Sequence, residues 1–160
     1  MLIDKKSTQL LRDKILSERK VFCRGLFLSA RWFVVSQIAE KRTHLIVLPT
    51  REAAEYCSAD LYNLVEGDSV FYLPDSGGAV ERSNYKSSLG VQRTAAIGKM
   101  MDPGVGPLYI VTYPAALEEL VPDQEKITSA LLTISVGQEI SYDDLREILI
   151  QQGFERVDFV

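Results

Sequence analysis

Residues 25–32 of the chain, GLFLSARW, have the spacing of a phosphate-binding loop, G-x-x-x-x-G-K-[ST], but not its contents. Ala30 stands where that loop has its second glycine, Arg31 where it has lysine, and Trp32 where it has a hydroxyl residue. A working loop needs small residues that let backbone N–H groups reach the phosphates, a lysine, and a Ser or Thr oxygen for Mg²⁺. Arg31 keeps the charge, but an indole has no oxygen to offer a hard cation.

We therefore interpret this loop as a structural relic, in which Gly25 is kept for its backbone freedom. The alternative is a weak anion site formed by Arg31 and the start of the following helix, because helix N-termini attract negative charge.

ATP hydrolysis also needs a carboxylate at the end of a strand to hold magnesium, and the best candidate is Asp75. It follows the apolar run SVFYLP, but Pro74 intervenes and no glutamate comes after it to position water. We expect Asp75 to be a turn residue, and we expect no metal site and no bound cofactor.

Other polar residues have simpler interpretations than catalysis. His44 is the single histidine and has no serine or cysteine in a nucleophile setting near it, so we expect no catalytic role. Asp143 and Asp144 fall in the first turn of a predicted helix, where carboxylates stabilise the positive end of the helix dipole.

The composition is that of an ordinary globular protein: 160 residues, 46% hydrophobic and 25% charged, with a net charge of −4. The basic residues are scattered among acidic ones, so no basic surface for non-specific nucleic acid binding is indicated. Cys23 and Cys57 lie in apolar surroundings without metal-ligand spacing, and we expect two reduced, buried thiols. No apolar run reaches the ~18 residues of a membrane span, and we expect a cytoplasmic protein.

Hydrophobic periodicity predicts helices that alternate with strands. The predicted helices cover residues 7–20, 30–41 (capped by Ser29), 50–65 and 87–101, and the predicted strands cover 21–28, 44–49, 69–74 and 107–113. The run HLIVLP at 44–49 is continuously apolar, which is typical of a strand covered on both faces. Such alternation predicts the α/β class with a parallel sheet flanked by helices.

After Pro122 the pattern changes to a strand, a turn at Gly137, a helix from about Ser141 to Gly153, and a last short strand. This predicts one domain over 1–126 and the start of a small α+β domain over 127–160. Too few strands follow to close a second sheet, so we expect a piece of a longer protein.

Several segments, taken in order, resemble the N-terminal region of bacterial transcription-repair coupling factors, and related spacing occurs in the excinuclease component UvrB. They are GLFLSAR, LIVLPTREAAEYCSADL, YLPD, VQRTAAI, LYIVTYPAALEELVP and VGQEISYDDLREILIQQGFERVDFV. The last of these is the most specific, because it is similar to the entry into the domain with which both families bind the excinuclease component UvrA.

The resemblance implies a RecA-like α/β domain with a degenerate P-loop that has lost its ATPase, followed by the first part of an adaptor domain. The family's full-length proteins are ATP-driven DNA translocases that displace stalled RNA polymerase and recruit UvrA to damage. In this chain the resemblance implies no catalytic residues. It implies that UvrA binds through the adaptor domain, mostly outside this chain, and the candidate partner-binding residues within it are Arg146, Phe154 and Arg156. The sequence departs from the family where Pro74 and Asp75 run into Ser76-Gly77-Gly78.

Arg51, Arg93 and Tyr113 occupy places where translocating relatives touch the nucleic acid backbone. In this acidic chain we expect exposed positions or intramolecular salt bridges instead. The hypothesis is thus a non-catalytic scaffold and adaptor, which would contact other domains of its parent and would reach RNA polymerase and DNA only through that parent. The alternative is a small P-loop-like nucleotide hydrolase with a divergent loop.

Overall fold

The computed structural model of the chain describes residues 5–76, 83–121, 123, 125, 132 and 134–151, with the backbone alone for 83–87. It divides into two compact units, Met1–Leu120 and Val121–Val160.

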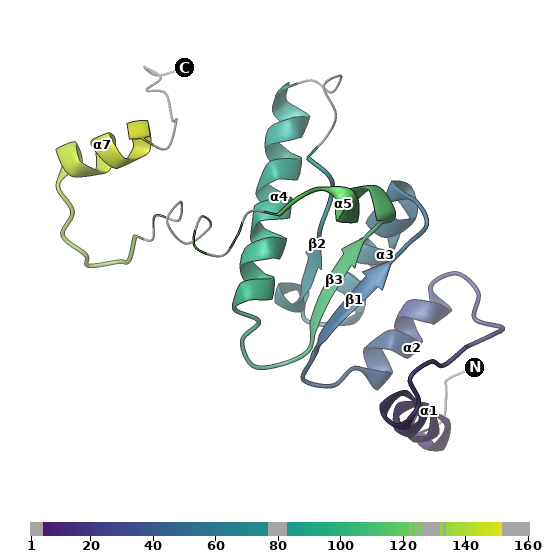
Figure 1. Ribbon diagram of the computed structural model, residues 1–160. Helices are drawn as coiled ribbons and strands as arrows, with labels where there is room; N and C mark the ends of the chain where they lie inside the picture. Colours follow the sequence, from purple (N-terminus) through teal and green to yellow (C-terminus); the bar gives the residue numbers. More distant parts are fainter. Residues whose placement is uncertain are drawn as a thin grey trace. The chain divides into compact units, whose positions relative to one another are not determined.

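A parallel sheet forms the centre of the first unit (Figure 1). Its strands are β1 (Thr43–Val47), β2 (Val70–Tyr72) and β3 (Leu108–Thr112), in the order β1-β3-β2. Ile110 of β3 stands opposite Leu45 on one side and Phe71 on the other. Every residue of β3 is buried. The predicted mixed α/β class with a parallel sheet flanked by helices is confirmed.

The helices of the described residues are α1 (Lys5–Ser17), α2 (Ala30–Ile38), α3 (Arg51–Leu64), α4 (Ser83–Met101), α5 (Pro114–Glu118) and α7 (Tyr142–Gln151), and a 3-10 turn η1 (Gly67–Ser69) leads into β2. Thr50 caps α3 by accepting a hydrogen bond from the Ala53 N–H at 3.2 Å. α3 packs on β2 and β3, and α4 packs on β2.

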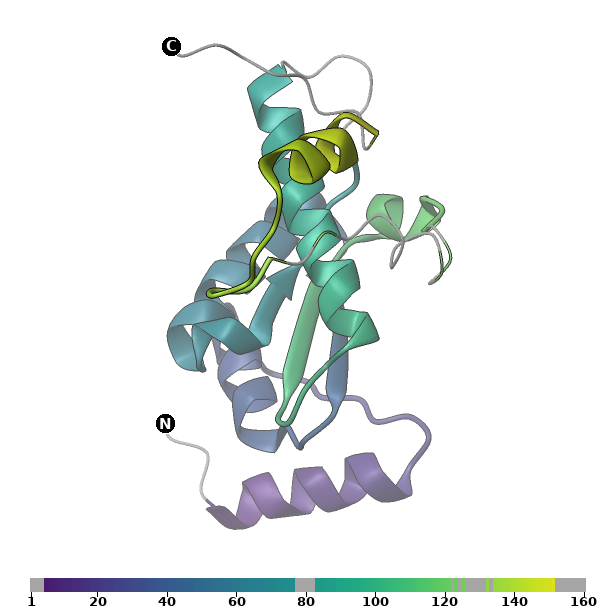
Figure 2. The same cartoon turned by 90° about the vertical axis from the view of Figure 1, so that its left-hand side faces the viewer.

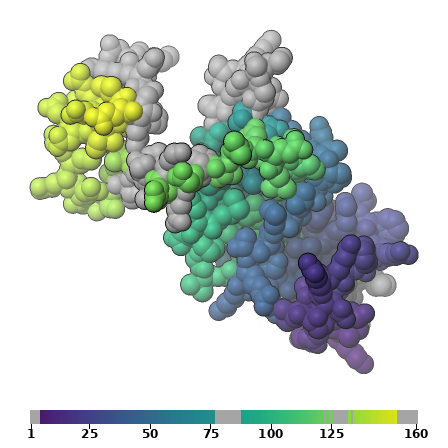
Figure 3. Space-filling model, in the orientation of Figure 1, coloured from purple at the N-terminus to yellow at the C-terminus, as the bar shows by residue number. Residues whose placement is uncertain are grey.

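α1 lies at one end of the first unit, next to α2 (Figure 2). Arg12 ties the two helices together, because its Nη2 donates to the Gln37 carbonyl at 2.9 Å. α1 has no buried residue of its own. The residues from α1 through α2 make up one end of the unit's surface (Figure 3).

The main core lies between the sheet, α2 and α3. Its buried members are Trp32, Leu48, Ala54, Cys57, Leu61, Val111, Tyr113 and Ala116. Trp32 is only 8% exposed. The side chain at the position of the loop hydroxyl is therefore a core side chain.

The predicted strand over 21–28 is wrong, because these residues form no strand. Gly25 (φ +79°) and Leu28 (φ +48°) adopt left-handed backbone conformations that interrupt an extended chain. Phe22 and Phe27 are 77% and 79% exposed. An apolar run becomes a stable strand only when a neighbouring strand pairs with it, and the three described strands leave this segment without one.

Two burial predictions are also wrong. β1 is an edge strand whose residues alternate between exposed and half-buried, and the strand covered on both faces is β3 instead. Cys57 is buried as predicted, but Cys23 is exposed, because the strand that was to bury it does not form.

In the second unit, the predicted turn at Gly137 is confirmed: its φ is +87°, and the Gln138 N–H donates to the Ser135 carbonyl at 3.1 Å. α7 follows Ser141 and has Asp143 and Asp144 in its first turn, as predicted. The predicted last strand lies outside the described residues, as does part of the strand predicted before Gly137. Among the described residues, no helix is both long enough and apolar enough to cross a membrane.

Candidate functional site

The segment with phosphate-loop spacing folds as a tight turn that leads into α2. The Ala30 N–H donates to the Phe27 carbonyl at 3.1 Å, and the Arg31 N–H donates to the Leu28 carbonyl at 3.5 Å. Backbone donors that face the phosphates in a working loop are therefore directed to carbonyls of the turn itself. An anion at this helix start would lack both donors.

Ser29 precedes α2 but does not cap it, so the predicted cap is wrong. Its backbone has helical angles (φ −67°, ψ −10°) rather than the extended ones that capping requires, and no capping bond forms. Its hydroxyl instead donates to Oδ2 of Asp60 on α3 at 2.6 Å. The Asp60 carboxylate thus places a negative charge beside the start of α2, which disfavours a phosphate there.

The Arg31 side chain lies over the ring of the adjacent residue, Trp32. Its guanidinium carbon lies 4.8 Å from the ring centroid of Trp32, and its Nε donates to the Leu28 carbonyl at 3.3 Å. The open cavity beside this pair measures ≈ 400 Å³. It is lined by Leu28, Ser29, Arg31, Trp32, Ala53, Tyr56, Cys57 and Asp60.

At the carboxyl end of the sheet, consecutive residues after β2 are each held by a side chain from elsewhere in the unit. The Leu73 carbonyl accepts from Thr112 Oγ1 (2.8 Å), and the Pro74 carbonyl accepts from Arg93 Nη1 (2.7 Å). The Asp75 N–H donates to the Tyr113 hydroxyl (3.1 Å), and the Ser76 N–H and hydroxyl donate to Glu119 (2.9 and 2.8 Å). Ligand sites of open α/β sheets lie at this end of the strands. In this structure these hydrogen bonds connect the residues after β2 to β3, to α4 and to the end of α5.

Arg93 is the centre of this network. It is 8% exposed, its Nε lies 3.4 Å from Glu119 Oε2, and its Nη1 also donates to the Ala116 carbonyl at 3.2 Å. Its Nη2 is buried without a hydrogen-bond partner among the described residues. The structure therefore brings together Asp75, Arg93 and Tyr113, which the sequence treats separately.

The salt-bridge expectation is confirmed for both arginines. Arg93 pairs with Glu119, and Arg51 pairs with Glu55 at 3.2 Å on the surface of α3. The same expectation is wrong for Tyr113, which is buried in the core rather than exposed, and burial raises the pKa of its hydroxyl. That group therefore stays protonated at neutral pH.

His44 is a packing residue in this structure. Its ring stacks on Tyr109 with centroids 5.4 Å apart, and its Nε2 lies 3.3 Å from the Glu40 carbonyl. Among the described residues, no three or more His, Cys, Asp or Glu side chains form a group able to hold a metal ion.

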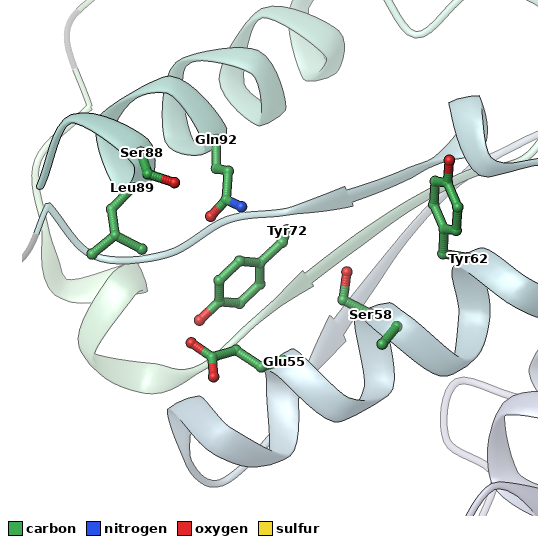
Figure 4. A pocket seen from close by; sticks show the side chains of 8 residues that line it. Glu55, Ser58, Tyr62, Tyr72, Ser88, Leu89 and Gln92 are labelled. Carbon is green, nitrogen blue, oxygen red and sulfur yellow. The ribbon is translucent and has the colours of Figure 1, made fainter. Parts of the chain in front are cut away.

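A second open cavity, of ≈ 420 Å³, lies between α3 and α4 beside β2 (Figure 4). Its lining residues are Glu55, Ser58, Ala59, Tyr62, Tyr72, Ser88, Leu89 and Gln92. Burial is the main cause that raises the pKa of Tyr72, and the neighbouring Tyr113, whose ring centroid lies 6.3 Å away, raises it further.

Of the predicted partner-binding residues, Arg146 is exposed on α7, beside Asp143, Glu147 and Ile150. Phe154 and Arg156 lie outside the described residues, so that site stays a prediction.

Sequence reasoning missed three residues: Asp60, Glu119 and Tyr72. Asp60 meets Ser29 across 31 positions of sequence, and no local pattern predicts that contact. The position of Glu119 could have been predicted. β3 ends at Thr112, and residues that follow the carboxyl end of a strand lie at the edge of a parallel sheet where ligand sites form.

The sequence of the chain is similar to that of a known protein. The transcription-repair-coupling factor of Bacillus subtilis (strain 168) is 31% identical over 139 residues, which cover 85% of this chain and 12% of that protein. The chain thus has a distant relationship to a transcription-repair coupling factor and spans only a small part of its length. No family model and no solved structure matches the chain.

Proposed function

We propose that this chain is a non-catalytic scaffold and adaptor segment of a transcription-repair coupling factor, and that its RecA-like unit neither binds nor hydrolyses ATP. The observation that carries the proposal is the turn at residues 27–32. Trp32 fills the core where a phosphate loop has a hydroxyl, and Asp60 holds Ser29 at the start of α2. The distant similarity to a coupling factor supports the repair context.

The same proposal gives the two units different tasks. The first unit, in which hydrogen bonds hold residues 73–76 at the carboxyl end of the sheet, serves as the scaffold that supports the adaptor domain. The second unit begins the adaptor domain through which the longer protein recruits the excinuclease component UvrA. RNA polymerase and DNA are engaged by other parts of that protein.

Calorimetric titration with Mg-ATP tests the non-catalytic role. We expect no saturable heat up to roughly 1 mM ligand, which excludes binding free energies stronger than about −4 kcal/mol. A saturable signal that Arg31→Ala abolishes would favour the nucleotide hydrolase instead.

The adaptor role is tested in the Bacillus subtilis relative. The matching segment of that protein is replaced by this chain, and strand-specific repair is measured after ultraviolet damage. We expect the chimera to retain repair and to capture UvrA in a pull-down. A chimera that folds and displaces RNA polymerase but captures no UvrA would contradict the adaptor role.

A further inference from the structure

The free edge of β2 is open to an added strand. β2 pairs with β3 on one side and has no neighbour on the other within the described part of the chain. The Leu73 N–H points inward to the Val111 carbonyl at 2.8 Å. Because backbone groups of successive residues face opposite edges of a strand, the N–H and C=O of Tyr72 point outward. They are the groups that a further strand would pair with.

The cavity of Figure 4 lies at this edge. α3 forms one wall with Glu55, Ser58 and Tyr62, and α4 forms the other wall with Ser88, Leu89 and Gln92. Tyr72 projects from β2 between the two helices, toward Glu55 (Figure 4). An extended segment that pairs with β2 would therefore place a side chain between α3 and α4.

The chemistry of the cavity favours a basic side chain there. Glu55 is the charged residue among its described lining residues, and the lining also offers the amide of Gln92 and two serine hydroxyls. The Tyr72 hydroxyl is buried, and its oxygen can accept a hydrogen bond from an inserted ammonium group. Arg51 already pairs with Glu55 Oε1 at 3.2 Å, so an inserted lysine would share this carboxylate with Arg51.

We propose that β2 and this cavity form a peptide-binding site, in which an extended polypeptide pairs with the backbone of Tyr72 and inserts a lysine side chain toward Glu55 and the Tyr72 hydroxyl. This mode combines main-chain hydrogen bonds for affinity with a side-chain pocket for specificity. It does not depend on the proposed repair function, because it uses neither the α2 turn nor the second unit.

Fluorescence anisotropy tests the site with three labelled pentapeptides, Val-Thr-Lys-Thr-Val and the versions with glutamine or glutamate at the centre. We expect saturable binding of the lysine peptide and at least roughly tenfold weaker binding of the glutamate peptide, because like charges across an interface oppose binding. N-methylation of the backbone amide of the central lysine should also weaken binding, since it removes a main-chain donor.

Two variants locate the binding. Glu55→Gln should bring the lysine peptide down to the affinity of the glutamine peptide, while the matched control Glu52→Gln, on the exposed first turn of α3 and outside the cavity, should change nothing. Tyr72→Phe should weaken binding several-fold and leave the fluorescence of Trp32 unchanged. No saturable binding by roughly 1 mM peptide, or equal loss in Glu55→Gln and Glu52→Gln, would overturn the proposal.

Discussion

At the scale of single residues, Trp32 decides what the α2 turn can do. Its indole belongs to the same buried core as Cys57, Leu61 and Val111, and the Arg31 guanidinium lies over the ring. Protein interiors are close-packed, so a threonine at this position would leave an unfilled space rather than a magnesium ligand. In this structure the packing of Trp32 and the hydrogen bonds to the Phe27 and Leu28 carbonyls hold the turn in its conformation.

Substitution of Trp32 measures this packing. Trp32→Ala should lower the free energy of unfolding by about 3–5 kcal/mol, because it removes a buried aromatic ring. Trp32→Thr should cost a similar amount and should restore no ATP binding. The matched control is Arg31→Ala, which truncates an exposed neighbour and should cost less than about 1 kcal/mol. Urea denaturation followed by circular dichroism measures all three, and unchanged midpoints for both Trp32 variants would show that the ring is not part of the core.

The two cysteines should differ in reactivity. Cys57 is fully buried, and burial raises its pKa from 9.0 to about 12, whereas Cys23 is exposed. An aromatic disulfide reagent should therefore label Cys23 in the native protein and Cys57 only after unfolding, because the thiolate is the nucleophile. Rapid labelling of both thiols without denaturant would contradict the buried position of Cys57.

The raised pKa of Cys57 also predicts how stability depends on pH. The folded state favours the neutral thiol, so this contribution is complete below the ordinary pKa of 9.0 and is lost as pH rises toward 12. Over that range the unfolding free energy of the unmodified protein should fall more steeply than that of Cys57→Ala. Parallel curves would show that the thiol titrates alike in both states.

At the scale of elements, two glycines in the first unit offer a matched pair. A Cβ at Gly67 in η1 would collide with the ring of Tyr62 on α3, while a Cβ at Gly90 in α4 meets nothing within 4 Å. Gly67→Ala should destabilise the protein by less than about 1 kcal/mol, because the Tyr62 ring must move but is 61% exposed and can turn toward solvent. Gly90→Ala should stabilise it by about 0.5–1 kcal/mol, because alanine is favoured in helices. Thermal unfolding measures both, and the same sign for the two variants would contradict the close approach of η1 to α3.

The elements also show which features are readable from sequence. The sequence predicts the helices α1, α2, α3, α4 and α7, because the residues that favour a helix lie close together in the chain. The burial of a strand depends on its neighbours, which are distant in sequence. For that reason the apolar run HLIVLP predicts a strand covered on both faces, whereas the covered strand in the structure is β3, between β1 and β2.

The candidate site was less predictable for the same reason. The sequence identified Arg31, Trp32, Asp75, Arg93 and Tyr113 as positions of interest, but it did not pair them. Arg93 reaches Pro74 across 19 positions and Ala116 across 23, and only the completed fold brings these groups together.

At the scale of the whole molecule, the main core belongs entirely to the first unit, since all of its members precede Leu120. In the second unit, α7 has no buried residue. Trp32 is the single tryptophan of the chain, so its fluorescence reports on the first unit alone. Circular dichroism in the far ultraviolet reports on both.

Deletion of residues 121–160 should therefore leave the urea midpoint measured by Trp32 fluorescence unchanged, while the helical signal falls through the loss of α7. The physical reason is that hydrophobic stabilisation follows the apolar area buried, and every member of the main core belongs to the first unit. An intact chain with one point substitution in α7, Leu145→Ala, is the control and should likewise leave the fluorescence midpoint unchanged. If the deletion lowers the unfolding free energy of the first unit by more than about 1 kcal/mol, beyond what surface changes usually cost, the second unit supports the core and the two units do not fold independently.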